Sequence, residues 1–121
     1  MKHYQSPHFD SVVSDLKALI ESSLEDGKAN DVVTIDLHGK TDVADYMIVA
    51  SGTSQKHTSS LAQILIKNIK AKQAADVSVE GAEEGNWVLV DAGDIVVHLF
   101  KPETRDLYNL EKMWDAPLFA T

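Results

Sequence analysis

The chain contains no cysteine, so it has neither a disulfide framework nor a metal site built from thiolates. It also lacks an apolar run that approaches the roughly 18–20 residues needed to cross a lipid bilayer. The first residues, MKHYQSPHFDSVV, have no apolar core of the kind found in a secretory signal. These absences argue against a membrane protein and against a secreted protein, and we expect a cytoplasmic protein.

Basic residues are scarce as well, with 11 Lys and Arg against 19 Asp and Glu and a formal net charge of -8 at pH 7. Phosphate backbones attract concentrated Lys and Arg, so we do not expect autonomous nucleic-acid binding. The acidic balance instead favours a basic protein partner, mainly through association rate and specificity. The alternative is that the charge only maintains solubility.

The length and the hydrophobic pattern predict one domain that spans residues 1–121. An amphipathic helix is expected within residues 1–27, because Ser6-Pro7 is typical of a helix start and apolar residues then recur every three or four positions. A second helix is expected to begin at Thr53 or Ser54. The expected strands are Asp31–Leu37, Tyr46–Ala50, Val77–Val79, Trp87–Val90 and Ile95–Phe100, followed by a C-terminal helix and a tail at residues 115–121. This order predicts an α/β (α+β) fold with a mixed, mostly five-stranded sheet flanked by helices.

The turn Gly52-Thr53-Ser54 is a candidate enzymatic site, because a turn between a strand and a helix can present backbone N–H groups to an anion. The turn is not a Walker loop, and about a dozen residues after it include no carboxylate that could hold Mg²⁺. Asp91 and Asp94 could approach a metal, but Asp is also a common structural residue in turns. We therefore expect no enzyme, no cofactor and no metal, with a degenerate nucleotidyltransferase-like enzyme or nucleotide-binding protein as the alternative.

The histidines are scattered along the chain and show no standard spacing for a zinc site. His98 lies in an otherwise apolar strand, so we expect a buried or half-buried, hydrogen-bonded residue rather than a metal ligand. His57, near the start of the second helix, could contact a partner or cap local polar groups.

Trp87 begins an expected strand, and strand alternation places it on one face with Leu89 and Asp91. Core packing and a protein interface explain this tryptophan equally well. An aromatic residue flanked by acids is typical of an interface anchor with a charged rim. For Leu107 and Leu110, whose spacing defines one helical face, core packing is the better explanation.

Three motifs follow one another between Val32 and Trp114. They are TDVADYMIVASGTS at residues 41–54, WVLVDAGDIVVH at residues 87–98 and YNLEKMW at residues 108–114, with His57 and Glu80-Gly81 between them. Together they resemble the ribosomal silencing factor family, RsfS (also called Iojap or YbeB), and the joint pattern is specific although each motif alone is modest. The resemblance implies a fold similar to that of nucleotidyltransferases, without nucleotidyl transfer and without a cofactor.

The resemblance further implies a homodimer that binds ribosomal protein fourteen of the large subunit, blocks joining of the small subunit and slows translation when nutrients are scarce. In this interpretation Trp87 is the apolar anchor of the contact. The acidic contact residues would pair with Lys or Arg of the partner. A role of residues 1–27 in dimerisation is expected from topology alone. The implied contact residues are Trp87, Asp91, Asp94, His98, Tyr108 and Glu111.

Overall fold

The computed structural model describes residues 7–104, and the side chains of residues 12–104. Its elements are α1 (Pro7–Asp26), β1 (Asn30–Asp36), β2 (Tyr46–Ser51), α2 (Gln55–Ala71), β3 (Ser78–Glu80), β4 (Trp87–Asp91) and β5 (Ile95–Phe100). Their order agrees with the order predicted from the sequence, although β1 lies one residue earlier and β3 one residue later than expected. Residues 102–104 are helical. The rest of the predicted C-terminal helix and the tail at residues 115–121 lie outside the described residues.

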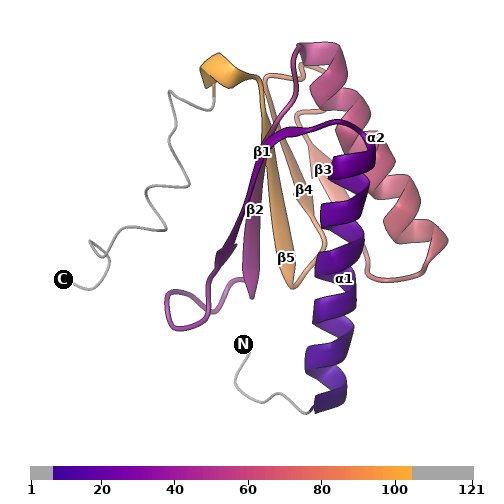
Figure 1. Cartoon of the computed structure of the whole chain (residues 1–121), viewed down its shortest axis with the longest axis vertical. Coiled ribbons are helices and arrows are strands. Elements are labelled where there is room, and N and C mark those ends of the chain that lie inside the picture. The colour runs from indigo at the N-terminus through magenta and orange to yellow at the C-terminus, as the bar shows by residue number, and fades with distance from the viewer. Residues whose placement is uncertain (1–6, 105–121) are drawn as a thin grey trace.

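The strands form a five-stranded sheet in the order β1-β2-β5-β4-β3 (Figure 1). β2 and β5 run parallel, whereas the other neighbouring strands run antiparallel. A parallel pair needs a long connection, and the chain between β2 and β5 provides it through α2, β3 and β4. The predicted α+β fold with a mixed sheet is confirmed.

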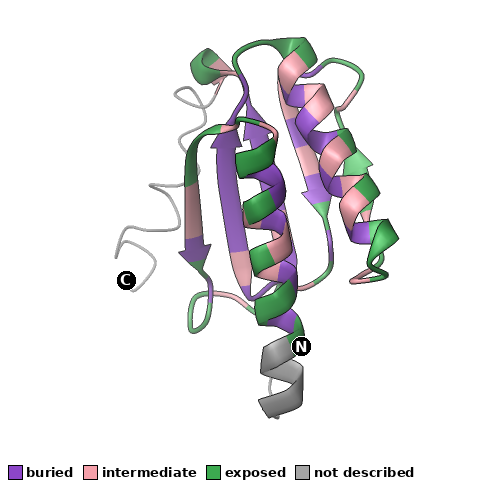
Figure 2. Cartoon of the chain, turned by 45° about the vertical axis from the view of Figure 1, so that its right-hand side comes forward, coloured by how far each residue is buried: buried purple, intermediate pink, exposed green. Residues whose placement is uncertain are grey.

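Both helices lie on the same side of the sheet (Figures 1 and 2). Their apolar stripes form the main core, in which Ile20 and Leu24 of α1 and Leu65 of α2 are fully buried. Between the helices, the Asn68 amide donates a hydrogen bond of 2.8 Å to the Ser23 hydroxyl. Within residues 7–104 we find no helix with the length and apolarity needed to span a bilayer. The sheet residues in this core are Ile48, Ala50, Val88, Val90, Ile95, Val97 and Leu99.

The opposite side of the sheet carries a second apolar cluster, which contains no helical residue among those described. Successive side chains of a strand point to opposite faces, so these residues alternate with those that contact the helices. We call this side the helix-free face, because no helix in the described part of the chain packs on it. The buried members of its cluster are Ile35, Leu37, Ala44, Met47, Val49 and Phe100, with Val33, Trp87 and Val96 partly buried against them.

Candidate protein-docking site

Trp87 and His98 lie together on the helix-free face. The indole N–H of Trp87 donates a hydrogen bond of 2.9 Å to Nδ1 of His98. Phe100 packs beside both rings, with centroid distances of 5.3 Å to Trp87 and 6.1 Å to His98. The register of β4 and β5 creates this group by pairing Trp87 with Phe100 and Leu89 with His98. Trp87 is therefore half-buried and held in one orientation by a polar contact and a ring contact.

His98 is only 9% exposed, and this burial lowers its pKa from 6.5 to about 4. To accept a hydrogen bond from Trp87, Nδ1 needs a free lone pair, so the neutral ring carries its proton on Nε2. The expectation of a buried, hydrogen-bonded histidine is confirmed. At neutral pH His98 orients Trp87 and carries no charge.

Asp91 and Asp94 flank the turn between β4 and β5. The exposed Asp91 accepts a hydrogen bond of 2.8 Å at Oδ1 from the backbone N–H of Gly93, whose φ of +84° suits glycine. The backbone carbonyl of Asp94 accepts hydrogen bonds from the N–H groups of Asp45 (2.7 Å) and Tyr46 (3.3 Å). The turn thus presents the Asp91 carboxylate to solvent and is joined through Asp94 to the segment that precedes β2.

A groove of about 350 Å³ runs over the helix-free face. Of the contact residues that the resemblance implies, Trp87, Asp91 and His98 line it, and Asp94 lies in the adjoining turn outside the lining. Tyr108 and Glu111 lie outside the described residues. The complete lining is Leu37, Thr41, Val43, Ala44, Met47, Trp87, Leu89, Asp91, Val96 and His98.

Sequence reasoning did not identify several of these lining residues. Alternation along β4 had already placed Leu89 on the face of Trp87. Met47 and Val96 belong to β2 and β5, and only the strand register, which pairs them, brings them to the same groove. Val43 lies in the connection before β2, and no local signal in the sequence places it there.

The Gly52-Thr53-Ser54 turn is filled by side chains of α2. Nδ1 of His57 accepts a hydrogen bond of 2.9 Å from the Thr53 N–H. Nε2 of the same ring lies 2.8 Å from the carbonyl oxygen of Gly27, the residue after α1. Ser54 is the N-cap of α2, and its Oγ accepts from the His57 N–H over 3.1 Å. A Cβ at Gly52 would lie 2.5 Å from Oγ1 of the buried Thr58. Of the two interpretations of His57, the structure supports local capping, and the N–H groups of Gly52, Thr53 and His57, which an anion could use, already donate within the protein.

The described residues also offer no metal site. No group of three or more His, Cys, Asp or Glu side chains between residues 12 and 104 is placed to hold an ion. Asp91 and Asp94 are accounted for by the turn and by the backbone contacts of Asp94.

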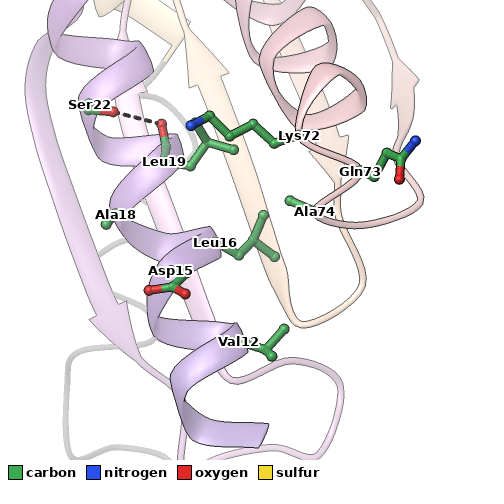
Figure 3. Close-up of a pocket in the computed structure, with 9 residues that line it drawn as sticks. All are labelled: Val12, Asp15, Leu16, Ala18, Leu19, Ser22, Lys72, Gln73 and Ala74. Atoms are coloured by element: carbon green, nitrogen blue, oxygen red, sulfur yellow. Dashed lines mark hydrogen bonds between the residues drawn. The ribbon is translucent and has the colours of Figure 1, made fainter. Parts of the chain in front are cut away.

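A second groove, of about 650 Å³, lies between α1 and the segment that follows α2 (Figure 3). In Figure 3 the side chain of Lys72 extends toward Leu19 of α1. This groove contains no aromatic residue and none of the contact residues that the resemblance implies, so the helix-free face is the better candidate site. The lining residues are Val12, Asp15, Leu16, Ala18, Leu19, Ser22, Lys72, Gln73 and Ala74.

Comparison with known proteins identifies the family. The family model described as "Ribosomal silencing factor during starvation" matches residues 11–118. The chain belongs to the ribosomal silencing factor family. The ribosomal silencing factor of Zymomonas mobilis is 48% identical over 99 residues, which cover 82% of this chain and 74% of that protein. The silencing factor of Bacillus subtilis is 39% identical over 98 residues, which cover 80% of this chain and 83% of the relative.

The chain is also similar to a mitochondrial protein and to a solved bacterial structure. The mouse protein named "Mitochondrial assembly of ribosomal large subunit protein 1" is 34% identical over 99 residues, which cover 79% of this chain and 43% of the mouse protein. A crystal structure from Chromobacterium violaceum matches with a TM-score of 0.81 at 38% identity and covers 85% of this chain and 86% of that one. The predicted family is confirmed, and its function is ribosome silencing, a form of translation regulation. The bacterial relatives are named as silencing factors and not as enzymes.

Proposed function

We propose that the chain binds ribosomal protein fourteen of the large subunit and thereby blocks joining of the small subunit. The contact would be made by the docking surface, which we define as the groove of the helix-free face together with Asp94. The observation that carries this proposal is a half-buried tryptophan in an apolar groove with an exposed carboxylate, Asp91, in its lining. Translation would slow when nutrients are limiting, in agreement with the word starvation in the family description.

The chemistry of the docking surface suits a basic protein. Trp87 can contribute a large contact area at the centre of an interface. Because His98 and Phe100 already fix the indole, little side-chain entropy is lost when a partner covers it. The Asp91 carboxylate can form a charge-assisted hydrogen bond with Lys or Arg. The net charge of -8 would speed association with a partner of opposite charge.

The proposed mechanism needs occupancy and no chemical step. A protein bound where the subunits meet excludes the small subunit by its volume alone, so neither a cofactor nor a catalytic residue is required. The name of the mouse relative also refers to the large ribosomal subunit. We propose the cytoplasm as the place of action, because the subunits that would be kept apart are found there.

The proposal includes a homodimer, as the resemblance implies. An interface along α1 would leave the helix-free face accessible to the ribosome, because the helices and the docking surface lie on opposite sides of the sheet. On α1 the side chain of Val12 is 44% exposed, beside the groove of Figure 3. Light scattering on the intact chain measures the oligomeric state, and a monomeric mass at all concentrations would contradict the dimer.

The function is tested by sedimentation of the protein with purified large subunits, followed by an assay of subunit joining. We expect the wild type to cosediment with large subunits and to lower the yield of joined ribosomes. Trp87→Ala should weaken binding by about 2 kcal/mol or more, which is about 30-fold, if Trp87 is the anchor. Val79→Ser is a control for the surface outside the groove, since Val79 is exposed on β3 and does not line the groove.

Circular dichroism on each variant separates a lost contact from a lost fold. Normal subunit joining in the presence of saturating wild-type protein would contradict the mechanism. Unchanged binding by a folded Trp87→Ala protein would show that the partner is bound elsewhere.

A further inference from the structure

The connection between β1 and β2, residues 37–45, closes one end of the groove. Met47 of β2, Val96 of β5 and Asp91 of β4 form one row across the sheet, because Val96 pairs with both of the others. Trp87 lies four residues from Asp91 along β4, a distance of roughly 13 Å at the rise of an extended strand. The groove therefore extends from Trp87 at one end to the connection at the other, where Val43 and Ala44 line it.

Val43 is the most exposed large apolar side chain among the described residues, with 78% of its surface accessible. A single exposed valine is common on protein surfaces and needs no explanation by itself. Val43 differs because it continues an apolar lining that includes Ala44 and Met47. Its neighbour Asp42 is exposed as well, so an apolar contact and an acidic group lie side by side at this end of the groove.

Hydrogen bonds hold the connection in place. The Val43 N–H donates to Oγ1 of Thr41 (3.2 Å), and the Leu37 N–H donates to the carbonyl of Asp45 (2.9 Å). The Asp45 N–H reaches the carbonyl of Asp94 (2.7 Å), which ties the connection to the turn between β4 and β5. The exposed Val43 thus lies in a segment whose backbone is hydrogen-bonded at both ends.

His38 adds side-chain contacts at the base of this connection. Its Nδ1 lies 2.6 Å from Oδ1 of Asp36, and its Nε2 lies 3.3 Å from Oδ1 of the buried Asp45. The imidazole thereby links the end of β1 to the residue that precedes β2. Partial burial by itself would raise the pKa of Asp36, but the backbone and side-chain hydrogen bonds from His38 outweigh it and the pKa is lowered.

We propose that residues 37–45 form a second contact of the docking surface, in which Val43 enters the interface and His38 holds the connection in position. This inference rests on the proposed function, because it assigns a second anchor to the same surface. The occupant is a segment of a basic protein of the large subunit that carries an apolar side chain next to Lys or Arg. The apolar side chain would meet Val43, and the cation would meet Asp42 or Asp91.

The charge around the groove favours a segment of a basic protein as the occupant. Here the lining is mainly apolar, and the exposed acids Asp42 and Asp91 lie near the end formed by the connection. Such an arrangement complements a basic protein surface.

The test compares Val43→Ser, Trp87→Ala and Val79→Ser for binding to purified large subunits. Val43 is exposed, so its replacement should leave the fold intact, and circular dichroism checks this. Removal of a valine that becomes buried on binding should weaken affinity about tenfold. Val79→Ser, which changes an exposed valine outside the groove, should bind like the wild type.

The outcomes separate the inference from the function on which it rests. Weaker binding by both Val43→Ser and Trp87→Ala, with no effect of Val79→Ser, supports the second contact. If Trp87→Ala weakens binding and Val43→Ser does not, the inference is wrong and the proposed function stands. If neither variant changes binding, the inference is wrong and the large subunit is bound outside the docking surface. An equal loss in Val43→Ser and Val79→Ser would also overturn the inference, because the effect would not depend on the groove.

His38 is a positioning residue in this proposal, so its effect should depend on Val43. His38→Ala should weaken binding about threefold in the wild type, and by less than about twofold when Val43→Ser is already present. Equal effects in the two backgrounds would show that His38 does not act through Val43. A residue that only stabilises the fold would not produce this dependence.

Discussion

The burial of His98 in the docking surface predicts how the free energy of unfolding changes in acid. The pKa of His98 is about 4 in the folded chain and near 6.5 when the ring is exposed, because burial disfavours the charged form. Between these two pH values the unfolded chain binds a proton that the folded chain does not. The contribution of His98 to the free energy of unfolding is therefore complete above pH 6.5 and is lost as the pH falls toward 4.

The size of the effect follows from the two pKa values. A change from 6.5 to about 4 corresponds to roughly 3 kcal/mol lost from this single group on going from neutral pH to its folded pKa. The hydrogen bond from Trp87 acts in the same direction, because a proton on Nδ1 would remove the acceptor of the indole N–H. A loss of this size is a large part of the stability of an ordinary small domain.

His98→Gln isolates this contribution. The glutamine amide has no titrating proton, and its oxygen can still accept from Trp87. Other groups that titrate, such as Asp36, are common to both proteins and cancel when the free energies of unfolding are subtracted. Urea denaturation followed by circular dichroism at several values from about pH 7 to about pH 4 gives the difference at each pH. We expect the wild type to lose roughly 3 kcal/mol relative to the variant over this range.

A second variant separates the titration of the His98 ring from its hydrogen bond with Trp87. His98→Phe keeps an aromatic ring beside Phe100, has no ionisable group and leaves the Trp87 N–H without its acceptor. It should be less stable than His98→Gln at neutral pH, and both variants should lack the acid-dependent loss of the wild type. If the wild type and both variants respond to pH in parallel, His98 is not shielded as described and the reasoning is refuted.

Two further predictions concern the helical side of the fold. Leu65→Ala removes a fully buried side chain from the core between α2 and the sheet. It should lower the free energy of unfolding by roughly 2–5 kcal/mol, measured by urea denaturation. A loss below this range would mean that the core collapses around the cavity. Ser54→Ala removes the N-cap of α2 and should cost about 1 kcal/mol in the same assay. Ser54→Asp, which can also cap, serves as its control, and a loss as large as that of alanine would argue against the capping role.

Local pattern was sufficient to predict most of the elements. The helical spacing of apolar residues identified α1 and α2, and the apolar runs identified β2, β4 and β5, which are the three inner strands of the sheet. β1 and β3 are each shifted by one residue from their predicted limits, and for β3 the reason is that all three of its residues are exposed. Its position depends on pairing with β4, in which Ser78 lies opposite Asp91 and Glu80 lies opposite Leu89. A short exposed strand has no hydrophobic pattern that could fix its limits.

The docking surface could be predicted only in part for a similar reason. Alternation placed Trp87 and Asp91 on one face, and that prediction depends on one strand alone. The hydrogen bond between Trp87 and His98 depends on the register of β4 against β5, which the turn between them determines. Val43 reaches the groove because Asp45 bonds to Asp94, a contact between segments far apart in the sequence. No local pattern contains that information.

The helix side of the sheet mainly contributes stability, and the helix-free face is the proposed binding surface. His98 lies on the helix-free face and contributes to both properties. Leu65 and the other core residues of the two helices should affect unfolding without changing affinity for the ribosome, because the sheet lies between them and the docking surface. Val43 should affect affinity with little change in unfolding, because it is exposed in the free protein. His98 is buried in the fold and also orients Trp87, so a proton on its ring should weaken both properties. In acid, the affinity for large subunits should therefore fall before the chain unfolds, and this early loss should be smaller in His98→Gln.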